Sequence, residues 1–162
     1  MRTKKVRLIS MILALAMLLA IAPVSAFADS EPGGSAEINV PLTEDGLLDT
    51  TADGVEPDGT NKYKGDGWTY DATASTPVLT ILGTRTANFG ENVLKCKVTN
   101  YGTLAGGTFS KSIRNEAGGL ITGGNFNGYV FNLGTIQNGV FRSNDLDNGS
   151  VIEGGTFYGL RS

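Results

Sequence analysis

The chain has 162 residues, with 13 basic residues, 16 acidic residues, no histidine and a formal net charge of −3. This balance lacks the basic stripe that nucleic-acid binding requires, and the absence of histidine removes the commonest metal ligand and general base. A single cysteine, Cys96, excludes an intramolecular disulfide. We therefore expect no nucleic-acid partner, no metal site and no cofactor.

Residues 1–28 have the pattern of a secretory signal peptide. A basic start is followed by an apolar run from Leu8 to Ile21 and by small residues that end at Ala28. The apolar run is shorter than the roughly 20 residues needed to span a bilayer, so cleavage after Ala28 is favoured over a membrane anchor. We predict a secreted protein, extracellular or at the cell surface, with no membrane segment after cleavage.

Residues 29–60 form an acidic leader. The stretch 29–58 carries nine carboxylates and no basic residue, with only scattered apolar side chains. Such a composition buries too little apolar surface to offset its ordering entropy, so we expect a mostly flexible segment. Calcium binding is the alternative left open, with Asp45, Asp49, Asp53, Glu56 and Asp58 as candidate ligands. The spacing of these carboxylates does not match the twelve-residue loop of helix–loop–helix calcium sites.

Residues 61–98 are predicted to form a small β module that caps the N-terminal side of residues 99–162. Aromatic and aliphatic residues alternate with polar ones at 68–70 and 79–81, and a turn-rich connection separates the two runs, which is typical of a hairpin. We expect Trp68 and Tyr70 to pack in the core rather than to bind a ligand. Cys96 alternates with Leu94 and Val98 on one face, which predicts a buried thiol.

Residues 99–162 contain degenerate repeats of about sixteen residues. Phenylalanine and asparagine recur at this period, at Phe109, Phe126, Phe141 and Phe157 and at Asn100, Asn115, Asn132 and Asn148. Three apolar anchors per repeat predict an all-β fold, a short parallel β-solenoid of about four coils. We expect the asparagines to form a hydrogen-bonded ladder. Glycines three residues before the phenylalanines, at 106, 123 and 154, are predicted to form corners with positive φ.

The C-terminal side of these repeats shows no obvious cap in the sequence. The last repeat ends at Phe157, five residues before Ser162. An open solenoid end is an unpaired edge, which predicts self-association. The alternative is that the chain is a fragment of a longer adhesin.

Several short motifs together resemble a known group of proteins. The sequence G-W-T-Y-D-A at 67–72, L-T-I-L-G at 79–83 and the recurring G-T-F units are similar to repeat-containing secreted and surface proteins of Gram-positive gut bacteria. That resemblance covers residues 67–162. It implies a right-handed parallel β-helix with a carbohydrate-binding-domain-like architecture.

The expected function is structural or adhesive and non-catalytic, with binding to glycans or other cell-surface components. Exposed aromatic rings on a rigid surface stack on sugars, and the outward candidates are Tyr101, Tyr129, Phe131 and Tyr158. The alternative is a polysaccharide lyase or hydrolase of the β-helix type, which needs carboxylates on one face; the candidates are Glu116, Asp145, Asp147 and Glu153. An ice-binding surface needs a regular line of threonines along the solenoid. It is disfavoured because the position before each repeat phenylalanine is not threonine throughout but Asn125 and Val140 in two repeats.

Overall fold

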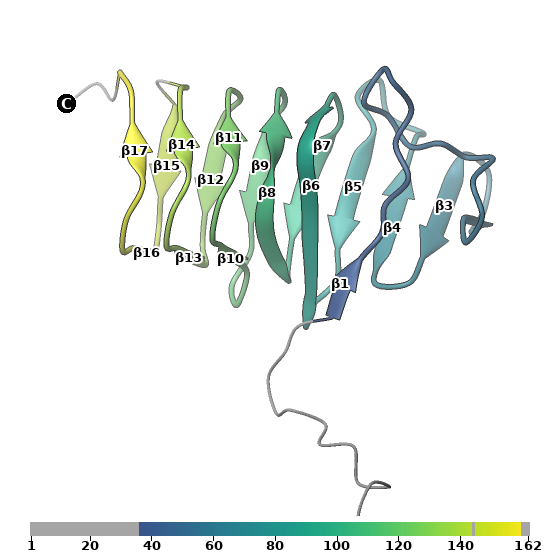
Figure 1. The fold of residues 1–162 in the computed structure, drawn as a ribbon, viewed down its shortest axis with the longest axis horizontal. Helices are drawn as coiled ribbons and strands as arrows, with labels where there is room; N and C mark the ends of the chain where they lie inside the picture. Colours follow the sequence, from purple (N-terminus) through teal and green to yellow (C-terminus); the bar gives the residue numbers. More distant parts are fainter. Residues whose placement is uncertain (1–35, 144, 160–162) are drawn as a thin grey trace, which may run out of the picture. The chain divides into compact units, whose positions relative to one another are not determined.

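The computed structural model describes residues 36–143 and 145–159, and the predicted signal peptide lies outside this part of the chain. The described residues form seventeen strands joined by turns and loops (Figure 1). They contain no helix that could cross a membrane. The strands belong to two sheets that face each other across a narrow core, as an all-β solenoid requires.

The eight-stranded sheet has the order β15–β12–β9–β7–β5–β4–β3–β2. From β5 to β15 all pairs are parallel, whereas β2, β3 and β4 continue the sheet as antiparallel hairpins. The hairpin predicted between 68–70 and 79–81 is therefore confirmed as β4 and β5. The strands are β2 (Glu56–Pro57), β3 (Lys62–Gly65), β4 (Trp68–Asp71), β5 (Val78–Ile81), β7 (Lys97–Asn100), β9 (Ile113–Asn115), β12 (Val130–Asn132) and β15 (Leu146–Asn148).

The nine-stranded sheet is parallel throughout and forks along its length. Two columns, β10–β13–β16 and β11–β14–β17, both join β8, which pairs with β6, and β6 pairs with β1. The third coil onwards thus has three short strands per turn, as the three anchors predict. The strands are β1 (Ala36–Ile38), β6 (Arg85–Leu94), β8 (Thr103–Phe109), β10 (Leu120–Ile121), β11 (Asn125–Phe126), β13 (Thr135–Ile136), β14 (Val140–Phe141), β16 (Val151–Ile152) and β17 (Thr156–Phe157).

The parallel β-solenoid is confirmed, but it has about five turns rather than the four predicted. The additional turn is the first, and it consists of β5 and β6, which pair in parallel with β7 and β8 of the second turn. In this turn Ile81 lies opposite Asn100, and Leu94 lies opposite Phe109. The first turn therefore pairs with the second, with register shifts within β6, and it lacks the asparagine and phenylalanine that mark the other four turns.

Two ladders of identical residues run through the core. The rings of the four repeat phenylalanines stack at centroid distances of 4.9, 4.7 and 4.8 Å. Asn100, Asn115 and Asn132 each donate their side-chain amide to the side-chain oxygen of the next repeat asparagine, at 2.8, 2.7 and 2.7 Å. These spacings match the strand separation of a sheet, so each coil supplies both apolar cover and hydrogen bonds to its neighbour.

The corner glycines differ from the prediction by one position. Positive φ occurs two residues before each phenylalanine, for example at Gly124 (φ 116°) and Gly139 (φ 140°), and not three residues before it. The glycine three residues before is needed for a different reason. A side chain at Gly123 would overlap the carbonyl oxygen of Ala105 in the preceding coil, so the two coils approach too closely for a Cβ atom.

The N-terminal end of the solenoid is covered by the segment that precedes it. Trp68 is only 1% exposed and donates its indole N–H to the carbonyl of Asn39 at 3.0 Å. The composition of residues 29–60 predicts a mostly flexible leader, yet Ile38, Val40 and Leu48 lie in the core. The physical reason is that the end of the stack offers a preformed apolar surface, on which a few scattered apolar residues can be buried.

The predicted burial of single side chains in the β module is confirmed. Tyr70 is buried together with Trp68, and Cys96 is fully buried between Leu94 and Val98. Desolvation raises the pKa of the Cys96 thiol to about 11. The thiol therefore packs as a small apolar group.

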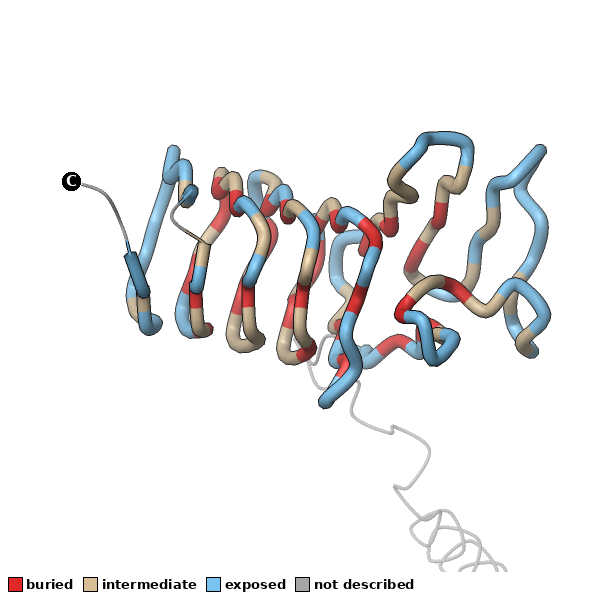
Figure 2. The backbone as a smooth tube through the Cα atoms, turned by 90° about the horizontal axis from the view of Figure 1, so that it is seen from above, coloured by how far each residue is buried: buried red, intermediate tan, exposed pale blue. Residues whose placement is uncertain are grey.

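The last described coil is the most exposed part of the solenoid (Figure 2). Ile152 is 37% exposed, whereas its stacking counterpart Ile136 is fully buried. The carbonyls of Ile136 and Phe141 accept hydrogen bonds from the last coil. The equivalent carbonyls of that coil have no partner among the described residues.

Candidate functional site

The outer face of the eight-stranded sheet carries one continuous row of side chains across seven strands. Strict alternation places the residue before each ladder asparagine on this face, while the asparagine points inward. The strand register aligns these outward residues with those of the hairpin cap. We call this the outer row, and it consists of Lys64, Thr69, Thr80, Thr99, Arg114, Phe131 and Asp147.

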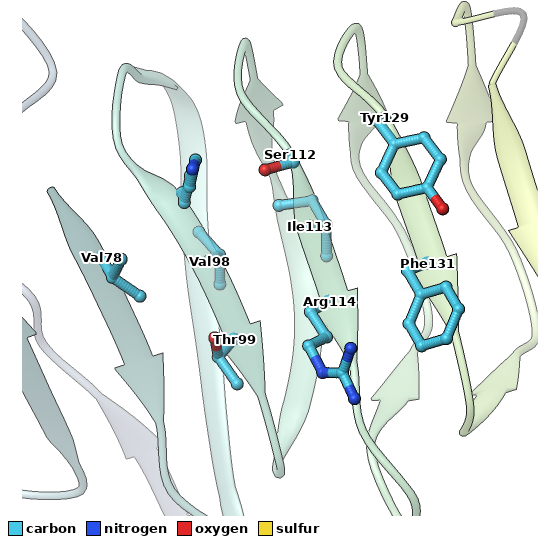
Figure 3. Close-up of a pocket in the computed structure, with 9 residues that line it drawn as sticks. Val78, Val98, Thr99, Ser112, Ile113, Arg114, Tyr129 and Phe131 are labelled. Carbon is cyan, nitrogen blue, oxygen red and sulfur yellow. The ribbon is translucent and has the colours of Figure 1, made fainter. Parts of the chain in front are cut away.

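A depression of about 450 Å³ lies on this face, over β5, β7, β9 and β12. The aromatic rings of Tyr129 and Phe131 form one side of it, both on the same stretch of chain, and Val78 lies at the opposite side (Figure 3). Polar groups between them come from Lys97, Thr99, Ser112 and Arg114. The floor is apolar, because inward-pointing Val98 and Ile113 underlie it. Rings beside hydroxyl and cationic donors over an apolar floor form a surface on which a sugar can stack and be hydrogen-bonded.

The side chain of Arg114 is held in place by contacts with two other side chains. Its guanidinium is ion-paired with Glu116 and lies over the ring of Phe131, 4.8 Å from the centroid. The hydrogen bond to Glu116 raises the pKa of Arg114, and the negative charge of Glu116 acts in the same direction. The cation–π contact and the ion pair fix the Phe131 ring and the guanidinium relative to each other.

Tyr129 is the more accessible of the two rings, at 41% exposure. Its hydroxyl lies 3.4 Å from a carboxylate oxygen of Asp147 on the next coil. Partial desolvation raises the pKa of Tyr129, and the negative charge of Asp147 acts in the same direction. The phenol therefore stays protonated at neutral pH and presents both an apolar ring and a hydrogen-bonding group.

The four predicted ligand-binding aromatics do not form a single cluster. Tyr129 and Phe131 line the depression, and Tyr101 lies just after β7, on the same sheet. Tyr158 instead follows β17 in the other sheet, where Arg142 lies 5.2 Å from its ring centroid.

Sequence reasoning missed the polar part of the depression, formed by Lys97, Thr99, Ser112 and Arg114. The signal for Thr99 and Arg114 was present in the repeat alignment. Both occupy the position before a ladder asparagine, like Phe131.

None of the carboxylates considered for catalysis lines the depression, although Glu116 and Asp147 each contact a residue that does. Glu116 is ion-paired with Arg114, and Asp145 and Asp147 flank Leu146 on the last coil, exposed to solvent. Glu153 follows β16 of the other sheet. Among the described residues, no group of three or more Cys, Asp or Glu side chains is arranged to hold a metal ion, including the acidic stretch from residue 36 to residue 58.

Comparisons with known proteins add no further constraint. No protein-family model matches the chain, and the searches of curated proteins and of solved structures found no match.

Proposed function

We propose that this protein is a secreted, non-catalytic repeat protein of the cell surface or extracellular matrix, and that it binds glycans through the outer face of its eight-stranded sheet. The observation that carries the proposal is the depression with Tyr129 and Phe131 on one side and hydroxyl and cationic groups beside them. Export is supported by the signal pattern in residues 1–28. The rigid solenoid supports a role as scaffold, with its outer side chains free to vary.

A glycan array probed with the purified chain, without its predicted signal peptide, tests this proposal. We expect binding to at least one class of glycan and a loss of that binding in Tyr129→Ala. Tyr158→Ala is the matched control, because Tyr158 is comparably exposed at 52% but lies on the other sheet. If no glycan is bound, or if both variants lose binding equally, the proposed site is wrong.

A second candidate role, self-association, is favoured by the exposed apolar side chains of the last described coil, Val151 and Ile152. Apolar residues of the segment before the solenoid cover the other end of the stack, so two copies are expected to pair through the exposed coil rather than to form head-to-tail fibres. Light scattering coupled to gel filtration is expected to show a concentration-dependent dimer. Ile152→Lys places a charge on the inward side of this coil and is expected to abolish the dimer, whereas Val151→Lys on the outward side of the same strand should weaken it less. A monomer at all concentrations would contradict this role.

An enzymatic role, in which the carboxylates act on a polysaccharide, is the weaker alternative. It requires two carboxyl groups placed on either side of a bound sugar, and the depression is lined by no carboxylate. Turnover of pectin or alginate by the pure protein would establish it in place of the non-catalytic role.

A further inference from the structure

A second depression lies beside the first on the same sheet face. It has a volume of about 400 Å³ and is lined by residues of the hairpin cap and of β5. Val78 belongs to the lining of both depressions, so the two are adjacent and form one track. The track crosses the boundary between the cap and the solenoid and runs perpendicular to the strands.

Three threonines mark the course of this track. Thr69, Thr80 and Thr99 are directly opposite one another on β4, β5 and β7, so their side chains follow at the strand spacing of about 4.8 Å. All three are partly exposed. Their hydroxyls make no hydrogen bond to any other described residue, in contrast to the hydroxyls of Thr51 and Thr73. The rank therefore offers free hydrogen-bonding groups at a regular spacing.

The length of the track exceeds that of a single sugar. From Thr69 on β4 to Phe131 on β12 the outer row crosses four strand intervals, or about 19 Å. A second line of side chains beside the outer row widens the track; it consists of Asp71, Val78, Lys97, Ser112 and Tyr129. An extended chain that lies along the solenoid axis would contact the threonine rank and the two aromatic rings at the same time.

All but one of the charges along the track are paired. Lys62 is paired with Asp71 at 3.2 Å, and Arg114 is paired with Glu116. Asp58 is paired with Lys64 at 3.8 Å, so Lys97 is the one lining charge without an ion-pair partner among the described residues. A surface with a single unpaired cation fits a neutral ligand better than a polyanion, which needs a cluster of unpaired cations.

We propose that the ligand of this face is a neutral, flat, linear polysaccharide of the β-1,4-linked type, bound across both depressions. This inference rests on the proposed glycan binding and specifies the class of glycan that is bound. The ring of Tyr129 would stack on one sugar, and the threonine hydroxyls would bond the hydroxyls of the following sugars. Affinity should then grow with chain length.

Calorimetry with cello-oligosaccharides of two, four and six residues tests the length of the site. We expect affinity to rise at least tenfold from cellobiose to cellohexaose. Maltohexaose has the same composition but a coiled α-1,4 shape, and we expect it to bind at least tenfold more weakly than cellohexaose. Equal affinities for the short and long chains, or for the two hexasaccharides, would overturn the inference.

Thr80→Val tests the contribution of the threonine rank, because valine keeps the branched shape and removes only the hydroxyl. One lost hydrogen bond is expected to weaken cellohexaose binding about three- to tenfold. Thr135→Val, on the outer face of the other sheet, is the matched control and should bind like the unmodified protein. Circular dichroism before and after thermal unfolding verifies that both variants fold.

The outcomes separate this inference from the proposed function. Glycan binding that depends on Tyr129 but includes no cello-oligosaccharide, or that is unaffected by Thr80→Val, refutes the extended track and leaves glycan binding in place. Absence of binding to every glycan refutes both.

Discussion

Replacing Asn115 by alanine removes a central rung of the asparagine ladder. The Asn115 side chain donates to the side-chain oxygen of Asn132 at 2.7 Å and to the carbonyl of Gly119 at 3.2 Å, and it accepts from Asn100 at 2.8 Å. All three asparagines from 100 to 132 are fully buried. Water therefore cannot replace the lost bonds without entering the core.

The expected cost depends on which groups lose their only partner. The Asn100 amide keeps two carbonyl acceptors, and the Gly119 carbonyl keeps a backbone amide. The side-chain oxygen of Asn132 loses the only donor that the structure gives it. An unsatisfied buried acceptor and the vacated volume together cost about 2–4 kcal/mol. This is a large fraction of the total stability of about 5–15 kcal/mol typical of a domain.

Urea denaturation followed by circular dichroism measures the free energy of unfolding. Two other alanine variants provide the comparison. Asn148 ends the described ladder and is exposed, so water can satisfy its partner, and Asn148→Ala is expected to cost less than about 1 kcal/mol. Asn127→Ala changes an exposed asparagine in the same coil as Asn115 and should be nearly neutral. If Asn115→Ala is no more destabilising than these two, the ladder does not stabilise the fold.

Three further predictions concern single side chains. The pKa of the Cys96 thiol is raised to about 11, so the thiol should not react with a disulfide reagent at pH 8 until the protein is unfolded by denaturant. A reaction in the folded protein would contradict the burial of Cys96. Gly139→Ala should lower the free energy of unfolding by about 1–3 kcal/mol, because φ is 140° and a Cβ atom would press on two phenylalanine rings. Gly118→Ala has open space around the new Cβ atom and should lower it by less in the same urea assay. The hydroxyl of Thr73 donates a hydrogen bond to the Asp71 carboxylate and lowers the pKa of Asp71 to about 2, so the ionised carboxylate stabilises the fold above pH 4 and this stabilisation is lost as the pH falls from 4 towards 2. Asp71→Asn should flatten this part of the pH–stability curve, and an unchanged curve would refute the assignment.

The repeats that carry both markers could be predicted from the sequence, and the first turn could not. Phenylalanine and asparagine recur because each must stack on its own kind, which leaves a visible period. In the first turn Ile81 replaces the asparagine, Leu94 replaces the phenylalanine, and the register shifts within β6. At the first turn any apolar side chain can cover the last asparagine or phenylalanine of the stack, so the sequence of this turn need not repeat those two residues. The packing of residues 36–48 was missed because the surface that buries them exists only after the coils have stacked.

The candidate site was predictable only in part. Tyr129 and Phe131 were identified as outward aromatics, but the polar groups beside them lie in other coils and meet them through strand register. The residue before each ladder asparagine could have been read from the repeat alignment as one row. Its continuation to Thr80 and Thr69 could not, because β4 and β5 belong to no marked repeat and are placed by hairpin pairing.

The alternation of inward and outward residues separates stability from binding in this fold. Inward positions stack on identical residues, so a change there alters the contacts with both neighbouring coils and is expected to lower the free energy of unfolding. Outward positions contact solvent and their row neighbours, so Tyr129→Ala and Thr80→Val should leave the unfolding transition within about 0.5 kcal/mol of the unmodified protein. A loss of glycan binding in either variant then reports on the surface itself. The opposite pattern, with binding lost only where the fold is weakened, would place the ligand elsewhere on the molecule.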